Sequence, residues 1–343
     1  MSAGTFTALL LERDGDGPVR AVTTDLPLDR LPGGGGVAEG EVEVAVTHSS
    51  LNYKDALIVT GSGGALVREH PHVPGIDLAG TVVAVGPGVD PAAAAVGDEV
   101  LVTGCWLGER RWGGMASRAR VPASWLVRRP TGLDAARAMT LGTAGFTARL
   151  CLDALARGGV GPGDGTVLVT GATGGVGSLA LHLLARAGHT VAAATGSPDA
   201  AALLHDLGAT EVVPRAELEA LAARPLASAR WAGVVDVAGG PVLAGALVST
   251  APRGVVAACG IAGGRRLDVD LAPFFARGVL LAGIDSVQHP MAERPAIWDR
   301  LTAAADPVVL DRLTTTIGLD DVADAAAGLL GRGGRGRTVV EVA

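Results

Sequence analysis

The chain has 343 residues, of which 48% are hydrophobic, and a formal net charge of -7. This length favours two domains, each large enough to bury a core of its own. The positive residues are scattered and the apolar runs are much shorter than the roughly 20 residues of a membrane helix, so neither nucleic-acid binding nor a membrane span is expected.

Cysteine use indicates the cellular compartment. Cys105, Cys151 and Cys259 lie far apart and form no CxxC pair, which argues against a disulfide framework and against a zinc site built from cysteines. The start of the chain lacks the basic residues and the long apolar stretch of a signal peptide. We therefore expect a protein of the reducing cytoplasm.

The first part of the chain has the pattern of short strands broken by glycine and proline. Residues 41–47 alternate valines with other residues, and further strands are predicted over 80–85 and 99–103. This part is therefore expected to form a β-rich domain.

From about Val167 the pattern changes to apolar strands that alternate with helical segments, which is typical of a parallel sheet with crossover helices. The predicted strands span residues 167–170, 190–195, 211–213, 233–237 and 254–259, and the predicted helices span residues 176–187, 199–207, 216–224 and 242–250. This pattern predicts a doubly wound α/β domain that binds a dinucleotide. A later helix over 320–330 and a final strand over 337–342 can return to the first domain.

A glycine-rich turn joins the first of these parallel strands to its helix. Residues 171–177 read GATGGVG, with the GxGxxG spacing on Ala172, Gly174 and Gly177. Gly174 would let the backbone approach a pyrophosphate, whose charge is met by the amides at the helix start, and Gly177 would allow close packing of helix on strand. Because the motif follows a strand and opens a helix, it favours dinucleotide binding over a tight turn without a ligand.

The end of the following strand predicts the choice of cofactor. An acidic residue about 20 positions after the turn would bind the ribose 2′-hydroxyl of NADH, but Thr195, Gly196 and Ser197 stand there. The missing carboxylate removes the repulsion that would exclude a 2′-phosphate, so NADPH is expected. Ser197 followed by Pro198 also has the pattern of a helix N-cap, and Arg215 is either a partner of the phosphate or a solvated surface arginine.

Short strings, in this order and spacing, resemble the acrylyl-CoA reductase branch of the quinone oxidoreductase-like medium-chain dehydrogenases/reductases. They are SSLNYKD at 49–55, PGIDLAG at 74–80, LGTAGFTA at 141–148, the glycine turn at 171–177 and GIDSV at 283–287. The resemblance covers almost the whole chain. It implies a GroES-like substrate domain over 1–130 that is completed by 303–343, a Rossmann domain over 131–302 that binds NADPH, and a homodimer.

The resemblance also bears on zinc. Zinc-dependent relatives carry Cys at the position of Asn52 and His at the position of Ile76, together with a loop of four cysteines, and this chain has none of these ligands. Because zinc needs three or four N, S or O ligands at suitable spacing, neither metal site is expected.

The resemblance further implies roles in cofactor binding. Tyr53 resembles the tyrosine that lies against the nicotinamide, and Thr143 resembles the residue near its carboxamide. The other implied contacts are the phosphate loop of Thr173, Gly174, Gly175 and Val176, the adenosine-phosphate contacts Thr195, Gly196 and Ser197, the stretch over the nicotinamide from Cys259 to Ile261, and Ser286. Many relatives carry Arg or Lys at the position of Ser197, which bears on the strength of the NADPH preference.

Reduction of an enoyl group needs a hydride donor, a partner for the enolate oxygen and a proton source. Tyr53 is the only tyrosine of the chain. Its phenol can donate a proton or hydrogen-bond the enolate, with Asn52 as a neighbouring amide donor; alternatively it only packs against the cofactor ring. Asp77 is a candidate for tuning a proton relay, although an Asp after a glycine turn more often caps the backbone.

A charged turn lies between two tryptophans. Residues 109–111 read ERR, with Trp106 before them and Trp112 after them. This segment either lines the substrate cleft or shields a loop.

The leading prediction is NADPH-dependent reduction of the carbon–carbon double bond of acrylyl-CoA or of a similar short 2-enoyl-CoA. One alternative of the same class is a quinone or enone reductase. An alternative of another class is a nucleotide-binding protein without turnover.

Overall fold

The computed structural model describes residues 4–15, 17–332 and 334–342, which form two compact units. The first unit comprises the described residues of 1–143, 287–302 and 310–343, and the second comprises 144–286 and 303–309. The buried Arg294 side chain ties the segment 287–302 to the rest of the first unit, because it donates a hydrogen bond to the carbonyl oxygen of Thr103 at 2.8 Å. The domain limits that the sequence analysis placed at residues 130 and 303 are a separate prediction, which this division into units does not test.

The first unit is built on a seven-stranded sheet in the order β14-β15-β3-β4-β5-β7, with β6 paired to β3, and on a separate β1–β2 hairpin. Its strands are β1 (Thr5–Glu12), β2 (Arg20–Pro27), β3 (Glu41–Leu51), β4 (Asp77–Val85), β5 (Glu99–Thr103), β6 (Arg118–Pro122), β7 (Val127–Arg128), β14 (Thr314–Ile317) and β15 (Arg337–Glu341). The alternating valines of β3 are buried in its core. The β-rich domain predicted for the first part of the chain is therefore confirmed.

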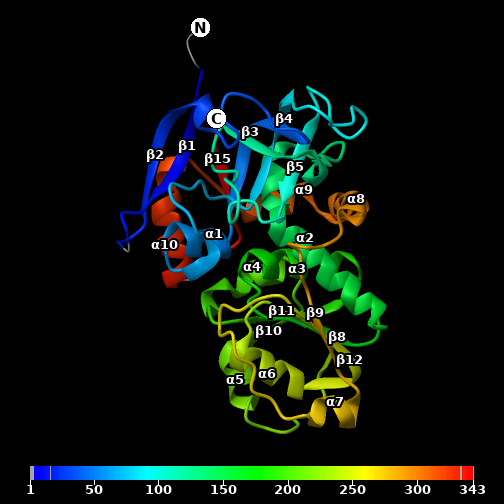
Figure 1. Ribbon diagram of the computed structural model, residues 1–343. Coiled ribbons are helices and arrows are strands. Elements are labelled where there is room, and N and C mark those ends of the chain that lie inside the picture. The colour runs from blue at the N-terminus through cyan, green and yellow to red at the C-terminus, as the bar shows by residue number, and fades with distance from the viewer. Residues whose placement is uncertain (1–3, 16, 333, 343) are drawn as a thin grey trace. The chain divides into compact units, whose positions relative to one another are not determined.

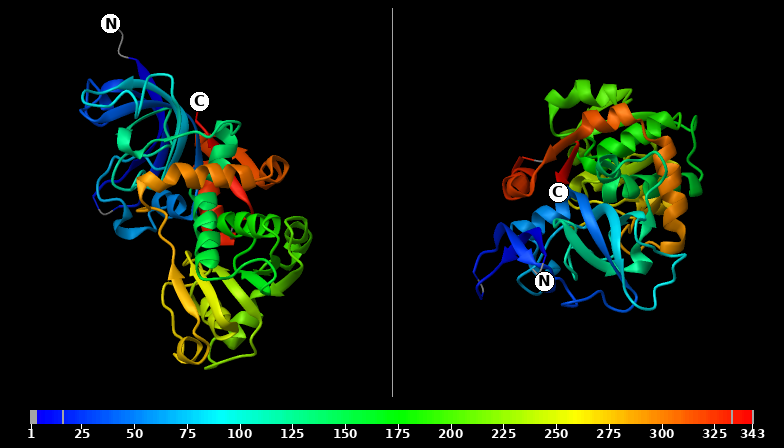
Figure 2. Two further views of the ribbon diagram at one scale, coloured as in Figure 1. Left: turned by 90° about the vertical axis from the view of Figure 1, so that its right-hand side faces the viewer. Right: turned by 90° about the horizontal axis from the view of Figure 1, so that it is seen from above.

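The last strand returns to this sheet, as the sequence predicts. In antiparallel pairing with β3, β15 sets Val339 opposite Ser50, and Figure 2 shows the red C-terminal strand beside the blue strands of the first unit. The longer helices that lie wholly or partly in this unit are α1 (Tyr53–Val59), α2 (Ala135–Arg157), α8 (Arg294–Ala304), α9 (Pro307–Leu313) and α10 (Val322–Arg332). Short 3-10 turns are η1 (Leu28–Arg30), η2 (Gly64–Leu66), η3 (Ala123–Trp125), η5 (Met291–Glu293) and η6 (Leu319–Asp321).

The second unit is a six-stranded parallel sheet in the order β10-β9-β8-β11-β12-β13. The strands are β8 (Thr166–Val169), β9 (Thr190–Thr195), β10 (Glu211–Pro214), β11 (Trp231–Asp236), β12 (Thr250–Ala258) and β13 (Leu280–Gly283). They are connected through α3 (Gly175–Arg186), η4 (Pro198–Ala200), α4 (Ala201–Asp206), α5 (Arg215–Leu221), α6 (Gly240–Val248) and α7 (Ala272–Arg277). All five strands predicted from the apolar pattern are present, so the doubly wound architecture is confirmed.

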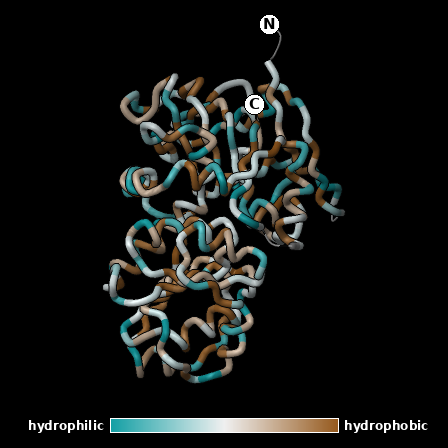
Figure 3. Tube along the Cα trace, turned by 180° about the vertical axis from the view of Figure 1, so that it is seen from behind, coloured by the Kyte–Doolittle hydropathy of each residue, from teal (hydrophilic) through white to brown (hydrophobic). Residues whose placement is uncertain are grey.

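Helices cover both faces of this sheet. Figure 1 shows α3 and α4 on one side of the strands and α5 and α6 on the other. The chain starts at β8, moves outward to β10, and then crosses to β11 on the opposite side of β8, so the direction of winding changes between β8 and β11. The buried side chains of the strands are small and apolar, and those of Ala192, Val234 and Val256 lie in the core. Figure 3 shows this apolar centre in brown.

α2 is a helix that the sequence did not predict, although its string LGTAGFTA was noted as a motif. Glycine and threonine in that string lower helix propensity, and the helix is in fact interrupted at Gly142, whose φ of 45° and ψ of -152° are not helical. The change of unit falls directly after the kink, at Thr143. No helix in the described part of the chain combines the length and the apolar character that a membrane crossing requires.

Candidate active site

The predicted phosphate loop lies between β8 and α3. Gly171 has a φ of 56°, a left-handed conformation that favours glycine, and α3 begins directly after Gly174. A Cβ atom on Gly177 would lie 2.2 Å from the carbonyl oxygen of Gly171, so only glycine lets the helix pack this close to the turn. The first amide groups of a helix have no acceptor within the helix, and the amide of Val176 is one of them here. Together with Thr173 in the turn, these amides could hold a pyrophosphate.

The predicted adenosine-phosphate contacts lie at the ends of the next two strands. The N–H of Ser197 donates to Thr195 Oγ1 at 3.0 Å, which orders the turn after β9. The Arg215 guanidinium lies against this turn, since a Cβ on Gly196 would be 3.3 Å from the Arg215 Cζ atom. Arg215 also pairs with Glu219 at 3.3 Å, but both side chains are largely exposed, so this pair is weak and leaves the guanidinium able to turn toward a 2′-phosphate.

The remaining predicted cofactor contacts follow β12 and β13. Cys259 comes directly after β12, and its N–H donates to the carbonyl oxygen of Asp236 at 2.9 Å. Ile261 is exposed, and Ser286 lies half-buried after β13. Because the carboxyl ends of parallel strands share one edge of a sheet, these residues lie along the same edge as the phosphate loop. The residues of the second unit that were predicted to contact the cofactor thus lie along one edge of its sheet, and their contacts with a cofactor stay a prediction.

In the first unit, Asp77 is the centre of a buried polar network. Its carboxylate accepts hydrogen bonds from Ser50 Oγ (2.6 Å), Asn52 Nδ2 (2.9 Å), and both the N–H (2.9 Å) and Oγ1 (2.5 Å) of Thr143. The kink at Gly142 brings Thr143 into this position, and a Cβ on Gly142 would lie 2.6 Å from Asp77 Oδ2. Asp77 is completely buried, and its carboxylate caps the backbone N–H of Thr143. Its part in a proton relay stays a prediction.

Asn52 links Asp77 to a second buried carboxylate and to a buried arginine. Its Nδ2 also donates to Asp55 Oδ2 (3.1 Å), its own N–H donates to the same oxygen (2.9 Å), and its Oδ1 accepts from Arg337 (3.1 Å). Asp55 Oδ1 in turn accepts the N–H of Ile76 at 2.9 Å. Sequence reasoning missed the roles of Ser50, Asp55 and Arg337.

Tyr53 begins helix α1, one residue after Asn52. Its side chain is 40% exposed although most of its neighbours are buried. Among the described residues no hydrogen-bond partner of its hydroxyl is found. The phenol is therefore held at its base by a rigid network and is open at its tip.

The glycine turn at the carboxyl edge of a doubly wound parallel sheet is the arrangement typical of a dinucleotide-binding domain in such a chain. Two family models match it: the alcohol dehydrogenase GroES-like domain over residues 38–131 and the zinc-binding dehydrogenase model over residues 175–303. Acrylyl-CoA reductase AcuI of Ruegeria pomeroyi is 45% identical over 338 residues, which are 98% of this chain and 99% of AcuI. The chain therefore belongs to the medium-chain dehydrogenase/reductase superfamily and, within it, to the acrylyl-CoA reductase family.

Solved structures agree with this assignment. The structure of Escherichia coli K-12 YhdH with bound NADPH has a TM-score of 0.91 and 45% identity, and the alignment covers 98% of this chain and 100% of that one. The structure of Bacillus subtilis YhfP with NAD bound has a TM-score of 0.91 and 39% identity, with 98% and 99% covered.

The zinc-binding name of the second family model raises the question of a metal. The described residues contain no group of three His, Cys, Asp or Glu side chains placed to hold a metal ion. At the two positions where zinc-dependent relatives place ligands, Asn52 uses its amide group inside the buried network and Ile76 is aliphatic. These residues do not fit a catalytic zinc ion.

Asp55 should make the stability of the protein depend on pH. Burial and the nearby charge of Asp77 raise its pKa from 3.8 to about 7. The folded chain then keeps a proton that the unfolded chain releases, so the Asp55 contribution to the free energy of unfolding falls as the pH rises from about 4 to about 7, by up to about 1.4 kcal/mol per pH unit. Asp55→Asn, which cannot ionise, should lack this component.

The check is chemical denaturation of wild type and Asp55→Asn across this pH range, with Glu39→Gln, an exposed acid, as the matched control. The stability of wild type minus that of Asp55→Asn should fall with pH, while the same difference for Glu39→Gln should show no such fall. A flat difference for Asp55→Asn would mean that folding does not raise the pKa of Asp55.

We expect at least a tenfold preference for NADPH over NADH, which corresponds to about 1.4 kcal/mol. The turn of Thr195, Gly196 and Ser197 offers no carboxylate, and Arg215 lies beside it. Ser197→Asp should reverse the preference, because a carboxylate there repels the phosphate and can bind a free ribose hydroxyl. Calorimetry with both cofactors on Ser197→Asp, with Ser197→Ala as the uncharged control, measures this; equal dissociation constants in wild type would contradict it.

Proposed function

We propose that this protein reduces the carbon–carbon double bond of acrylyl-CoA, or of a similar short 2-enoyl-CoA, with NADPH. The observation that carries the proposal is the 45% identity to acrylyl-CoA reductase AcuI along 98% of the chain. The intact phosphate loop and the NADPH found in the E. coli relative support the choice of cofactor.

Bound NADPH supplies the hydride that adds to the β-carbon of the substrate. The protein's own groups must then stabilise negative charge on the thioester oxygen and deliver a proton to the α-carbon. The phenol of Tyr53 suits both tasks, because it is exposed while its helix is anchored by Asn52.

Asn52 and Asp77 were also candidates for direct roles in the chemistry. The amide of Asn52 faces three acceptors inside the network, and the carboxylate of Asp77 accepts four hydrogen bonds. We therefore propose that both are positioning residues, which hold Tyr53 and Thr143 in place. A proton that reaches the substrate then comes from Tyr53 or from water.

An assay of NADPH oxidation tests the activity. The purified protein should reduce acrylyl-CoA faster than a quinone or a simple enone at equal concentration. Gly177→Val is a suitable control, because its side chain would collide with the phosphate turn. Faster reduction of quinones would favour the quinone reductase alternative, and NADPH binding without any turnover would favour a non-catalytic binding protein.

Tyr53→Phe tests the mechanism. The variant removes the hydroxyl but keeps the ring, so it should lose an interaction made only as charge develops. We expect kcat to fall by about a hundredfold, roughly 3 kcal/mol in barrier, with little change in NADPH affinity. Steady-state kinetics and a cofactor titration measure the two effects; normal saturated turnover with weakened NADPH binding would assign Tyr53 to packing alone.

We propose that the protein forms a homodimer through the edge of its parallel sheet. β13 is the outermost strand on its side. Leu280 on this strand is 52% exposed, and Leu271 and Phe275, at the start of α7 and within it, are 70% and 80% exposed. An exposed apolar edge strand invites pairing with a second copy, and a symmetric dimer would cover it.

Light scattering at micromolar concentration should therefore give twice the monomer mass. Leu280→Lys should shift the protein toward the monomer, whereas Val96→Lys, a change at an exposed apolar residue of the first unit, should not. A wild-type monomer would contradict the proposal.

We also propose a cytoplasmic location. The three cysteines are free thiols, as expected in a reducing compartment. Detection of the tagged protein in the cytoplasmic fraction of the source cell would test this.

A further inference from the structure

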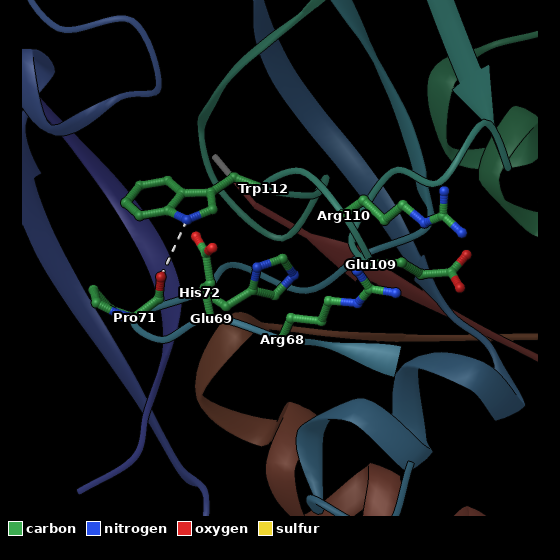
Figure 4. A pocket seen from close by; sticks show the side chains of 7 residues that line it. All are labelled: Arg68, Glu69, Pro71, His72, Glu109, Arg110 and Trp112. Atoms are coloured by element: carbon green, nitrogen blue, oxygen red, sulfur yellow. Dashed lines mark hydrogen bonds between the residues drawn. The ribbon is translucent and has the colours of Figure 1, made fainter. Parts of the chain in front are cut away.

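The first unit contains a cavity of about 360 Å³ beside the charged turn that lies between the two tryptophans. This size is within the range of small-molecule sites. Figure 4 shows Trp112, Pro71 and Glu69 toward one side of the cavity and Arg68, Arg110 and Glu109 toward the other. The cavity therefore has one end with an indole and a carboxylate, and another with two guanidinium groups.

The guanidinium end has an excess of positive charge. Glu109 is compensated, because its Oε1 pairs with Lys54 Nζ at 2.9 Å and its side chain is almost fully buried. The Arg110 guanidinium is stacked over the Trp106 ring at 3.8 Å, which orders it without consuming its charge. Arg68 is exposed and makes no hydrogen bond or ion pair with any other described residue. This end thus presents two guanidinium groups whose natural partner is a phosphate.

The other end suits a purine. Trp112 is half-buried, and its Nε1–H donates to the carbonyl oxygen of Pro71 at 3.3 Å, which sets the plane of the indole. An aromatic face stacks on a nucleobase, and a carboxylate such as that of Glu69 accepts hydrogen bonds from an exocyclic amine. His72 lies between the two ends and bonds the carbonyl oxygen of Gly108 at 2.9 Å. Burial lowers the pKa of His72, so at neutral pH it adds no positive charge.

We propose that this cavity binds the adenosine 3′-phosphate 5′-diphosphate portion of coenzyme A, with the adenine toward Trp112 and Glu69 and the phosphates toward Arg68 and Arg110. The inference rests on the proposed function, since it identifies where that substrate's carrier is held. On this proposal Glu109 and Arg110 of the turn at 109–111 line the substrate site, which is the first of the two roles that the sequence allows for this segment.

An ion pair connects the cavity wall to Lys54, the residue that follows the candidate catalytic tyrosine. Lys54, which follows Tyr53 in α1, bonds to Glu109 of the cavity wall. A thioester whose nucleotide is bound in the cavity can therefore extend its flexible arm from this wall toward the start of α1. Binding energy from the remote nucleotide would then position the reacting acyl group.

The test compares two substrates that share the acyl group but differ in the carrier: acrylyl-CoA and the acrylyl thioester of N-acetylcysteamine. Wild type should show a kcat/KM for acrylyl-CoA about a hundredfold or more higher. In the double variant Arg68→Ala/Arg110→Ala the ratio of the two kcat/KM values should fall by about ten- to a hundredfold, at roughly tenfold per lost phosphate contact. The fall should come mainly from a higher KM for acrylyl-CoA. The cysteamine thioester should be reduced at an unchanged rate, and the control Arg128→Ala, which changes an exposed arginine on β7, should behave as wild type.

A binding measurement separates failure of this inference from failure of the proposed function. Calorimetry with 3′-phosphoadenosine 5′-phosphate, on protein saturated with NADP⁺ so that the cofactor site is filled, should show binding that the double variant loses. If wild type reduces neither thioester, the proposed function is wrong, and this titration alone then tests whether the cavity binds the nucleotide. If 3′-phosphoadenosine 5′-phosphate does not bind to wild type, the inference is overturned. Equal kcat/KM for both thioesters in wild type, or an equal loss for both in the double variant, also overturns it.

Discussion

The carboxylate of Asp77 is the point on which the first unit depends. It is completely buried and accepts four hydrogen bonds, from the end of β3, from the residue before α1 and from the residue after the kink in α2. A buried charge is costly unless it is paired and hydrogen-bonded, and the nearest positive group is the guanidinium of Arg337, whose charge is felt by both Asp77 and Asp55. The network joins these elements to one another, and it anchors Asn52, the residue that precedes Tyr53.

The network also joins segments that lie far apart in the chain. Its hydrogen bonds and the buried guanidinium of Arg337 tie β3, β4, the start of α1, the kink in α2 and the start of β15 to one centre. Asn52 serves as the hub because an amide can donate to carboxylates and accept from arginine at once. Two carboxyl groups therefore lie close together in a buried site, where burial and the charge of Asp77 raise the pKa of Asp55 to about 7.

Much of this molecule could be predicted from sequence, and the limits have physical causes. The parallel strands were predictable because each is a short apolar run beside a glycine or proline, and the phosphate loop because close packing demands glycine at 177. Helix α2 was not predicted, since its kink at Gly142 and its threonines hide the helical period. The network was missed because its partners lie 25 residues apart for Asn52 and Asp77, and 285 for Asn52 and Arg337. No local pattern carries that information.

The pairing of β15 with β3 determines the order in which the two units can fold during synthesis. A chain leaves the ribosome from its N-terminus and its domains fold as they are completed, yet the network of the first unit stays open until Arg337 has emerged. The parallel sheet of the second unit, which ends at β13, is complete some fifty residues earlier. During translation the nascent first unit therefore contains the carboxyl groups of Asp55 and Asp77 before Arg337 is available. It stays incompletely folded while the second unit, which is encoded later, is already able to fold.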